Sequence, residues 1–197
     1  MRSIRPGFLF TTLFIPLLVT IPSTSMAAEH APRVRLETTM GNIVLQLDVK
    51  RAPVTVDNFL AYVNDGFYDG TIFHRVIDGF MIQGGGYTAD FSRKTARAPI
   101  KNEADNGLKN TIGSIAMART SDPHSANAQF FINVADNAVL DYKSPDARGW
   151  GYAVFGRVVV GMDVVDAIRT QATGVQGRLR DVPKTTITIT RAVVESP

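Results

Sequence analysis

The feature that most constrains the fold is a series of short apolar runs separated by turn residues. These runs have the length and composition of strands and occupy residues 34–38, 43–47, 71–76, 80–83, 113–117, 130–134, 153–160 and 186–194. The first two surround Met40-Gly41-Asn42, which indicates a hairpin. Gly84-Gly85-Gly86 is expected to interrupt strand pairing and to begin a long surface excursion that lasts until Asn110.

Two stretches have the period of an amphipathic helix instead. Arg51-Ala52-Pro53 opens the first, in which apolar residues recur at i, i+3, i+4 and i+7 from Val56 to Val63. Gly66 suits the left-handed position that ends a helix. The second follows Gly161-Met162-Asp163, and its inward residues are Val164, Val165 and Ile168. Many short strands with two separated helices favour a mainly β fold, a closed antiparallel barrel whose open ends the helices cap.

The N-terminus has the pattern of a secretory leader. Arg2 and Arg5 precede an apolar stretch at residues 7–21, and small residues follow at Ser25 and Ala27. We expect cleavage after Ala27, with the next residue as the alternative, and an uncleaved anchor as the competing interpretation. The expected organisation is a signal peptide at residues 1–27, a short tail at 28–32 and one domain at 33–195. An exported chain without cysteine fits the bacterial periplasm first and the secreted space second.

Composition excludes several classes of function. The absence of cysteine excludes disulfides, thiolate nucleophiles and cysteine-bound zinc. The three histidines, His30, His74 and His124, lack the spacing of metal ligands, so no metal site is expected. The formal charge of +3 becomes about +1 once Arg2 and Arg5 are removed with the leader, and basic runs with interleaved aromatic residues are missing. No nucleic-acid partner is therefore expected.

Residues 73–85 carry the densest group of candidate site residues. Their sequence is Phe-His-Arg-Val-Ile-Asp-Gly-Phe-Met-Ile-Gln-Gly-Gly, so Arg75 is followed five, six and eight residues later by Phe80, Met81 and Gln83. A second piece, Gln129-Phe130-Phe131-Ile132-Asn133, comes forty-odd residues further on. Because alternate residues of a strand share a face, two such strands could place a cation, an amide and an apolar floor around one pocket.

These two pieces resemble the active face of the cyclophilins, a family of peptidyl-prolyl cis-trans isomerases. The resemblance extends over about residues 34–194, most closely to the exported bacterial cyclophilins. Further blocks in family order are 53–59 (Pro-Val-Thr-Val-Asp-Asn-Phe), 100–104 (Ile-Lys-Asn-Glu-Ala), 113–118 (Gly-Ser-Ile-Ala-Met-Ala) and 154–158 (Val-Phe-Gly-Arg-Val). The resemblance implies an eight-stranded barrel with two capping helices. It also implies an isomerase that needs no cofactor and acts as a monomer on proline-containing segments of folding proteins.

The resemblance assigns roles to residues of this chain. It implies that Arg75 donates a hydrogen bond to the proline nitrogen at the twisted midpoint of the rotation, and that Gln83 braces the guanidinium or contacts the substrate backbone. An apolar set would hold the proline ring, and a polar rim would hold the residue before proline. The apolar set is Phe80, Met81, Phe131 and Leu140, and the rim is Gln129 with the backbone of Ala118 and Arg119.

The chain departs from the family at several places, among them the loop 119–124 (Arg-Thr-Ser-Asp-Pro-His), which differs from the Asn-rich loop of many relatives. Val139 stands where many cyclophilins have a tryptophan whose indole N–H is associated with cyclosporin binding, so weak cyclosporin binding is expected. Trp150 lies too far along to replace it. The segment 141–151 differs in length and content from the usual short turn, and Tyr152 is matched to a family histidine.

Two other functions compete with catalysis. The groove could belong to a binding module or holdase that only grips proline-containing segments. A small-molecule carrier would need an open barrel interior, yet the residues expected to point inward are bulky. They are Leu45, Ile72, Ile115, Phe130 and Val158.

Overall fold

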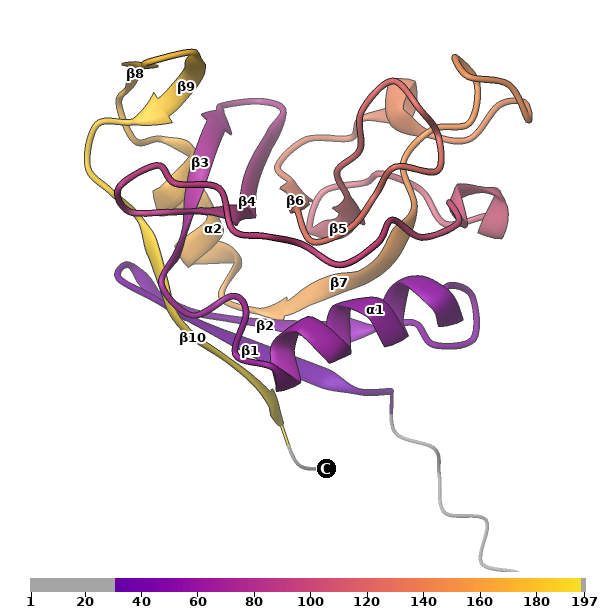
Figure 1. Cartoon of the computed structure of the whole chain (residues 1–197), viewed down its shortest axis with the longest axis horizontal. Coiled ribbons are helices and arrows are strands. Elements are labelled where there is room, and N and C mark those ends of the chain that lie inside the picture. Colours follow the sequence, from indigo (N-terminus) through magenta and orange to yellow (C-terminus); the bar gives the residue numbers. More distant parts are fainter. Residues whose placement is uncertain (1–30, 196–197) are drawn as a thin grey trace, which may run out of the picture.

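A computed structural model describes residues 31–195 and shows a closed antiparallel barrel (Figure 1). The order of its strands around the barrel is β1-β10-β3-β4-β6-β5-β7-β2. This confirms the eight-stranded architecture expected from the sequence. The strands are β1 (Arg33–Thr38), β2 (Gly41–Leu47), β3 (Thr71–Ile77), β4 (Met81–Thr88), β5 (Ser114–Met117), β6 (Phe130–Asn133), β7 (Val154–Val160) and β10 (Thr188–Glu195).

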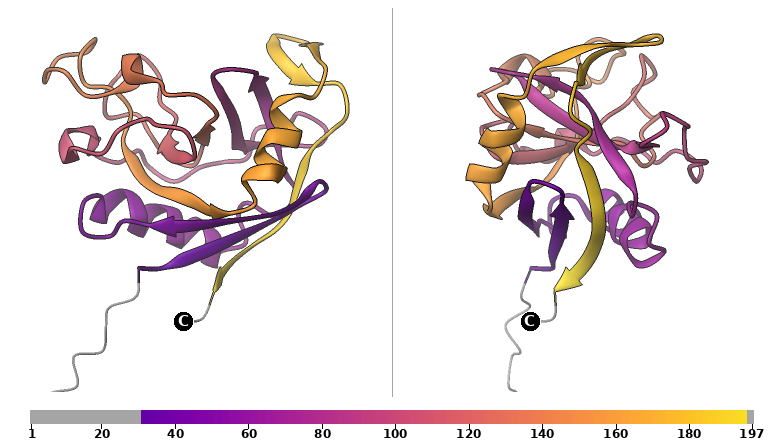
Figure 2. Two further views of the ribbon diagram at one scale, coloured as in Figure 1. Left: turned by 180° about the vertical axis from the view of Figure 1, so that it is seen from behind. Right: turned by 90° about the vertical axis from the view of Figure 1, so that its left-hand side faces the viewer.

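Both predicted helices are present, as α1 (Pro53–Asn64) and α2 (Met162–Arg169). Phe59 of α1 reaches the barrel core, where its ring lies 5.7 Å from that of Phe130 in β6 and 5.1 Å from that of Phe155 in β7. From α2, Val165 and Ile168 are fully buried in the same core, whereas Val164 is only partly buried. The left view of Figure 2 looks at the molecule from behind. There α2 is the orange helix, which contacts β2, β3 and β4. Each helix therefore uses its apolar stripe to close one part of the barrel.

The long excursion after β4 also stabilises the start of α1. The Glu103 carboxylate accepts hydrogen bonds from the backbone N–H of Val54 at 3.1 Å and of Thr55 at 2.8 Å. These N–H groups lie in the first turn of a helix, where they lack partners within the helix. A carboxylate at this end is also favoured by the helix dipole. The excursion is thus fixed to the barrel although it has almost no regular structure beyond the short turn η1 (Ala104–Asn106).

The excursion expected to begin at Gly84-Gly85-Gly86 begins only after Thr88, because all three glycines lie inside β4. The expected interruption of pairing is present, since the β3–β4 register passes from Phe73–Gly84 to Thr71–Thr88 and gives Gly85 and Gly86 no partner in β3. Gly85 has φ +79°, and a Cβ there would lie 2.9 Å from the Phe130 ring. Glycine lets the bulged strand approach the core closely instead of ending it. The strand predicted at residues 80–83 also begins one residue later, because Phe80 lies in the β3–β4 turn and not in a strand.

A hairpin that the sequence did not predict follows α2. It consists of β8 (Thr173–Gln176) and β9 (Leu179–Pro183), which form a separate two-stranded sheet outside the barrel. Gly177 turns the chain with φ +58°. In Figure 1 the hairpin stands beside the end of β3, and contacts between β3 and β9 agree with this placement. Its apolar residues, Val175, Leu179, Val182 and Pro183, do not alternate with polar ones, so it lacks the pattern by which the barrel strands were found.

The barrel interior is filled by side chains. Leu45, Ile115 and Phe130 are completely buried in one core cluster with Val158, and Ile72 is buried at 2% exposure. Packing of this kind leaves the interior to the core, which does not support a small-molecule carrier. Within residues 31–195, no helix has the length and apolar character that crossing a bilayer requires. The predicted signal peptide, cleavage point and most of the tail fall at residues 1–30, outside the described residues.

One buried histidine predicts how the stability of the fold depends on pH. His74 in β3 is 4% exposed, its ring lies 4.7 Å from that of Tyr87, and its Nδ1 has no hydrogen-bond partner among the described residues. Burial, with a smaller contribution from the Arg75 charge, lowers the pKa of His74 to about 4. The unfolded chain binds the proton near pH 6.5 and the folded chain only near pH 4, so acidification through this window favours unfolding.

We expect the free energy of unfolding to fall by about 3 kcal/mol between pH 6.5 and pH 4 because of His74 alone. Urea denaturation of the wild type and of His74→Phe at several pH values measures this contribution as the difference between the two curves. The phenylalanine variant should lose that part of the acid sensitivity. Parallel curves for the two proteins would contradict the assignment.

Candidate active site

The register of four neighbouring strands places the predicted catalytic residues in one row. Arg75 in β3 is paired with Gln83 in β4, Gln83 with Phe131 in β6, and Phe131 with Ala116 in β5. Because successive side chains of a strand point to opposite faces, the next row along the same strands points into the barrel. That inner row is Val76, Ile82, Ile132 and Ile115, all of it in the main core. The outer row is therefore free to form a site on the barrel surface.

An apolar cluster separate from the main core lies on this outer face. Met81, Ala116, Phe131 and Val154 are its buried members. The rings of Phe131 and Tyr152 meet edge to face at 5.6 Å. Partly buried side chains packed against the cluster are Ile77, Phe80, Leu108, Ala118, Leu140 and Tyr152. All six predicted site residues with apolar or aromatic side chains, from Phe80 to Tyr152, thus come together in one place.

The two predicted glutamines form a pair above this cluster. Gln83 Nε2 donates a hydrogen bond to Gln129 Oε1 at 2.9 Å, and the backbone N–H of Ala118 donates to the Gln129 carbonyl at 2.9 Å. Of the two roles expected for Gln83, bracing Arg75 finds no hydrogen bond among the described residues. Gly86 is close to this pair, since a Cβ there would approach the Gln129 side chain to 2.5 Å. The glycine therefore makes room for the glutamine at the rim.

Arg75 makes its closest charged contact with a residue that the sequence did not single out. Its Nε lies 3.6 Å from Oδ2 of Asp181 in β9, and both side chains are 42% exposed. Asp181 belongs to the unpredicted hairpin, and no motif spacing connects it to residues 73–85. Only the three-dimensional placement of β9 beside β3 reveals the pair.

Arg119 closes the rim on the side of Ala118. Its guanidinium stacks over the Tyr152 ring at 4.6 Å. Its Nε donates a hydrogen bond to the Gly151 carbonyl at 2.8 Å, and Nη1 donates to the Thr120 carbonyl at 2.8 Å. The expectation for Arg119 concerned its backbone, and the structure shows that the side chain also shapes the rim. Leu140 and Tyr152 are joined as well, because the Tyr152 N–H donates to the Leu140 carbonyl at 2.9 Å.

The segment 141–151 is anchored by Trp150. Its ring lies 4.8 Å from the His124 ring and 5.8 Å from the Tyr142 ring, both edge to face. The His124 Nδ1 in turn accepts a hydrogen bond from the backbone N–H of Asn102 at 3.1 Å. Val139, at the end of the site, is 72% exposed. Trp150 therefore packs against the segment itself. This agrees with the expectation that it does not replace the tryptophan that many cyclophilins have in place of Val139.

A buried chain of amides fixes the turn that carries Phe80. Asn137 Nδ2 donates to the Phe80 carbonyl at 2.8 Å and to Asn133 Oδ1 at 2.7 Å. Asn133 Nδ2 continues the chain to Ser114 Oγ at 2.9 Å. Because buried polar groups are costly unless they are paired, this network holds the turn in one position.

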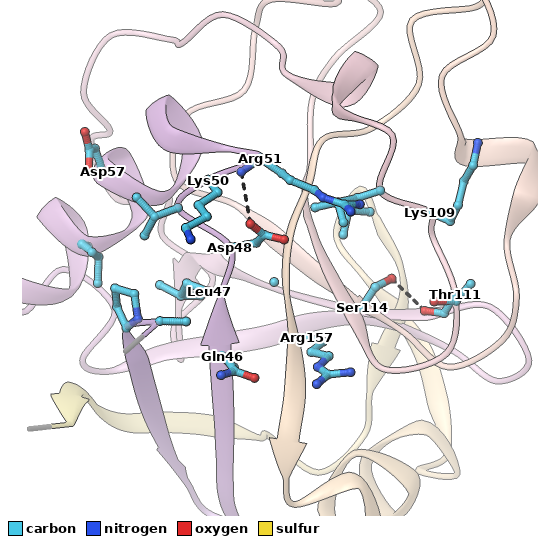
Figure 3. A pocket seen from close by; sticks show the side chains of 17 residues that line it. Gln46, Leu47, Asp48, Lys50, Arg51, Asp57, Lys109, Thr111, Ser114 and Arg157 are labelled. Carbon is cyan, nitrogen blue, oxygen red and sulfur yellow. Dashed lines mark hydrogen bonds between the residues drawn. The ribbon is translucent and has the colours of Figure 1, made fainter. Parts of the chain in front are cut away.

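A cavity lies elsewhere, between β2, β7 and the start of α1 (Figure 3). It encloses about 900 Å³ and is lined by residues of both charges, among them Asp48, Arg51, Lys109 and Arg157. It contains none of the predicted site residues and shares only Leu108 and Val154 with the apolar cluster of the outer face. Among residues 31–195 there is no group of three His, Cys, Asp or Glu side chains that could hold a metal ion.

Comparison with known proteins agrees with this geometry. The family model described as "Cyclophilin type peptidyl-prolyl cis-trans isomerase/CLD" matches residues 33–194. The chain is 60% identical over 161 residues to peptidyl-prolyl cis-trans isomerase cyp18 of Streptomyces antibioticus, covering 82% of this chain and 97% of that one. It is 55% identical over 161 residues to peptidyl-prolyl cis-trans isomerase B of Escherichia coli, covering 82% and 98%.

Solved structures show the same architecture. A cyclophilin type peptidyl-prolyl cis-trans isomerase of Cryptosporidium parvum superposes with a TM-score of 0.66 at 25% identity, covering 84% of this chain and 98% of that one. The structural match, the family model and the relatives all agree. The chain belongs to the cyclophilin-type peptidyl-prolyl cis-trans isomerase family.

Proposed function

We propose that this isomerase accelerates rotation about X-Pro bonds through Arg75, with the proline ring held in the outer apolar cluster. The observation that carries the proposal is the row Arg75, Gln83 and Phe131 on three adjacent strands, which places a permanent cation and an amide beside an apolar cluster. The reaction breaks no covalent bond, so positioned donors and an apolar surface are sufficient for it.

The required rate enhancement is within reach of such a site. Resonance gives the peptide bond a rotational barrier of about 18–20 kcal/mol. A turnover of about a thousand per second corresponds to a barrier of roughly 13 kcal/mol, so the site would supply on the order of 5–7 kcal/mol. At the twisted midpoint the proline nitrogen loses conjugation and becomes an acceptor. A donor aimed at that nitrogen stabilises the transition state more than the planar ground state.

Arg75 has the chemistry of this donor, because its guanidinium stays charged and carries its N–H groups in a rigid fork. The neighbouring cluster of Phe80, Met81 and Phe131 offers apolar contact to a pyrrolidine ring. A buried ring also excludes water, and a drier site strengthens the hydrogen bond from the guanidinium.

The polar rim would hold the substrate backbone on the other side of the rotating bond. Gln129 is fixed by Gln83 and by the Ala118 backbone, and Arg119 is fixed over Tyr152. Preordered polar groups of this kind bind a backbone with little further loss of entropy. One end of the substrate is thereby held while the proline end turns.

The substrates in this proposal are proline-containing segments of folding proteins. The Cryptosporidium parvum relative has also been solved in the presence of the dipeptide Ala-Pro. Uncatalysed X-Pro isomerisation takes tens of seconds or longer, so folding chains benefit from catalysis. The leader pattern at residues 1–27 further supports an exported enzyme acting in the periplasm.

Replacing Arg75 with alanine tests the mechanism. We expect the rate of cis-to-trans isomerisation of a short Ala-Pro peptide to fall by about 100-fold, because one preorganised donor to the transition state is lost. The assay uses the chain from Ala28 onward and follows the rate at several enzyme concentrations. Arg157→Ala, which removes an exposed arginine from β7, is the matched control and should keep full activity. An Arg75→Ala variant that binds peptide and isomerises it at the wild-type rate would exclude the mechanism. If the wild type bound peptide without turnover, a binding module would be the correct description.

Placing a tryptophan at position 139 tests the expectation that this chain binds cyclosporin weakly. The chain is expected to bind cyclosporin weakly because Val139 lacks an indole N–H. Val139→Trp should bind the drug about tenfold more tightly, since aromatic anchors dominate such contacts. Calorimetric titration measures both affinities, and Val160→Trp, at another exposed valine, is the control. Equal affinities for wild type and Val139→Trp would contradict the assignment.

Light scattering of the same samples should give the mass of a monomer. The mass of a dimer would contradict the expectation that the enzyme acts as a monomer.

Export is tested by expressing the full-length chain in a bacterium with two membranes. The protein recovered from the periplasm should begin at Ala28, as read from its intact mass. A full-length protein retained in the cytoplasm would contradict the leader assignment.

A further inference from the structure

The hairpin β8–β9 brings a carboxylate to the proposed catalytic arginine. The hairpin is not part of the barrel, yet β9 lies beside β3 (Figure 1). At this contact Asp181 Oδ2 lies 3.6 Å from Arg75 Nε. Nothing in the barrel core requires a carboxylate at this place, because both side chains are partly exposed.

The backbone of Asp181 has an unusual conformation. Its φ is +59°, and Phe91 is the only other non-glycine residue with positive φ within residues 31–195. The left-handed region costs free energy for most residues, although Asp and Asn tolerate it best. Such conformations persist where the surrounding structure holds them, and they concentrate at functional sites. Here the neighbours Val182 and Pro183 are buried and pair with Gly174 and Thr173 of β8, so the hairpin fixes the direction of the carboxylate.

The closest approach is at one edge of the guanidinium. Asp181 Oδ2 is nearest to Nε, and among the described residues no hydrogen bond occupies Nη1 or Nη2. Gln83, which is opposite Arg75 in the register, is bonded to Gln129 and does not hold the guanidinium. A long, partly exposed arginine otherwise samples many rotamers. A carboxylate at the Nε edge would restrict that motion and leave the Nη donors available to the substrate.

We propose that Asp181 is a positioning residue that holds the Arg75 guanidinium in its productive orientation. This inference rests on the proposed role of Arg75. Asp181 itself contacts neither the proline nor the rotating bond in this account. It reduces the entropy that Arg75 loses on reaching the transition state, so its effect belongs mainly to kcat.

The test compares Asp181→Asn with Asp65→Asn. Asparagine also tolerates positive φ, so the first variant removes the charge while the hairpin backbone keeps its conformation. Asp65 forms an exposed ion pair with Arg97 away from the site, so the second variant makes the same change of charge and also breaks an Arg–Asp pair. Peptide isomerisation is measured at low and high salt, with thermal stability measured alongside.

We expect Asp181→Asn to lower kcat by about two- to fivefold at low salt, which is the scale of an exposed ion pair, with little change in KM. Because salt screens exposed charges, the difference from wild type should shrink at high salt. Asp65→Asn should match wild type throughout. In the Arg75→Ala background, Asp181→Asn should have no further effect on the remaining rate.

Unchanged or increased kcat in Asp181→Asn would overturn the inference, as would a loss that follows KM alone or persists unchanged at high salt. If Asp181→Asn unfolds, Asp181→Gly, which also accommodates positive φ, replaces it in the same assay. Failure of the inference is distinguishable from failure of the proposed function. In the first case Arg75→Ala still loses most of its activity, by about 100-fold, and in the second Arg75→Ala itself keeps wild-type activity.

Discussion

The alternation of side chains across the barrel wall is the constraint on which the rest of the structure depends. One row of four strands points inward as Val76, Ile82, Ile132 and Ile115 and completes a dry core. The adjacent row must then point outward, and it contains Arg75, Gln83 and Phe131. A shift of one residue in any of these strands would exchange the two rows, burying a guanidinium and exposing core side chains. The packing of the core therefore fixes the register of the site.

The outward row forms a usable site because irregular segments surround it on fixed supports. The turn that carries Phe80 is held by Asn137, and the segment after Leu140 is held by Trp150 and Arg119. The hairpin with Asp181 closes the side next to β3. Each support is a hydrogen bond, an aromatic contact or an ion pair between segments distant in the sequence. A rigid barrel with loops tied in this way matches a reaction that needs preorganised donors and no covalent chemistry.

Most of the barrel and the composition of the site could be predicted, because both leave local signals in the sequence. Alternating apolar runs identified the barrel strands, and the spacing from Arg75 to Gln83 identified the outer face. The hairpin was missed because its apolar residues do not alternate with polar ones, so it has no strand period. The start of the excursion was misplaced at Gly84 to Gly86 because glycine marks both turns and close approaches, and only the position of the Phe130 ring and of Gln129 distinguishes them. The contact of Asp181 with Arg75 depends on tertiary placement alone.

We propose that substrate binds on the outer face and not in the cavity between β2 and β7. The most direct test is an NMR titration of the isotope-labelled chain from Ala28 with an Ala-Pro peptide. We expect the amide signals of Arg75, Gln83 and Phe131 to shift together with one dissociation constant, while those around Arg51 and Arg157 stay in place. Shifts confined to the cavity around Arg51 and Arg157 would contradict it.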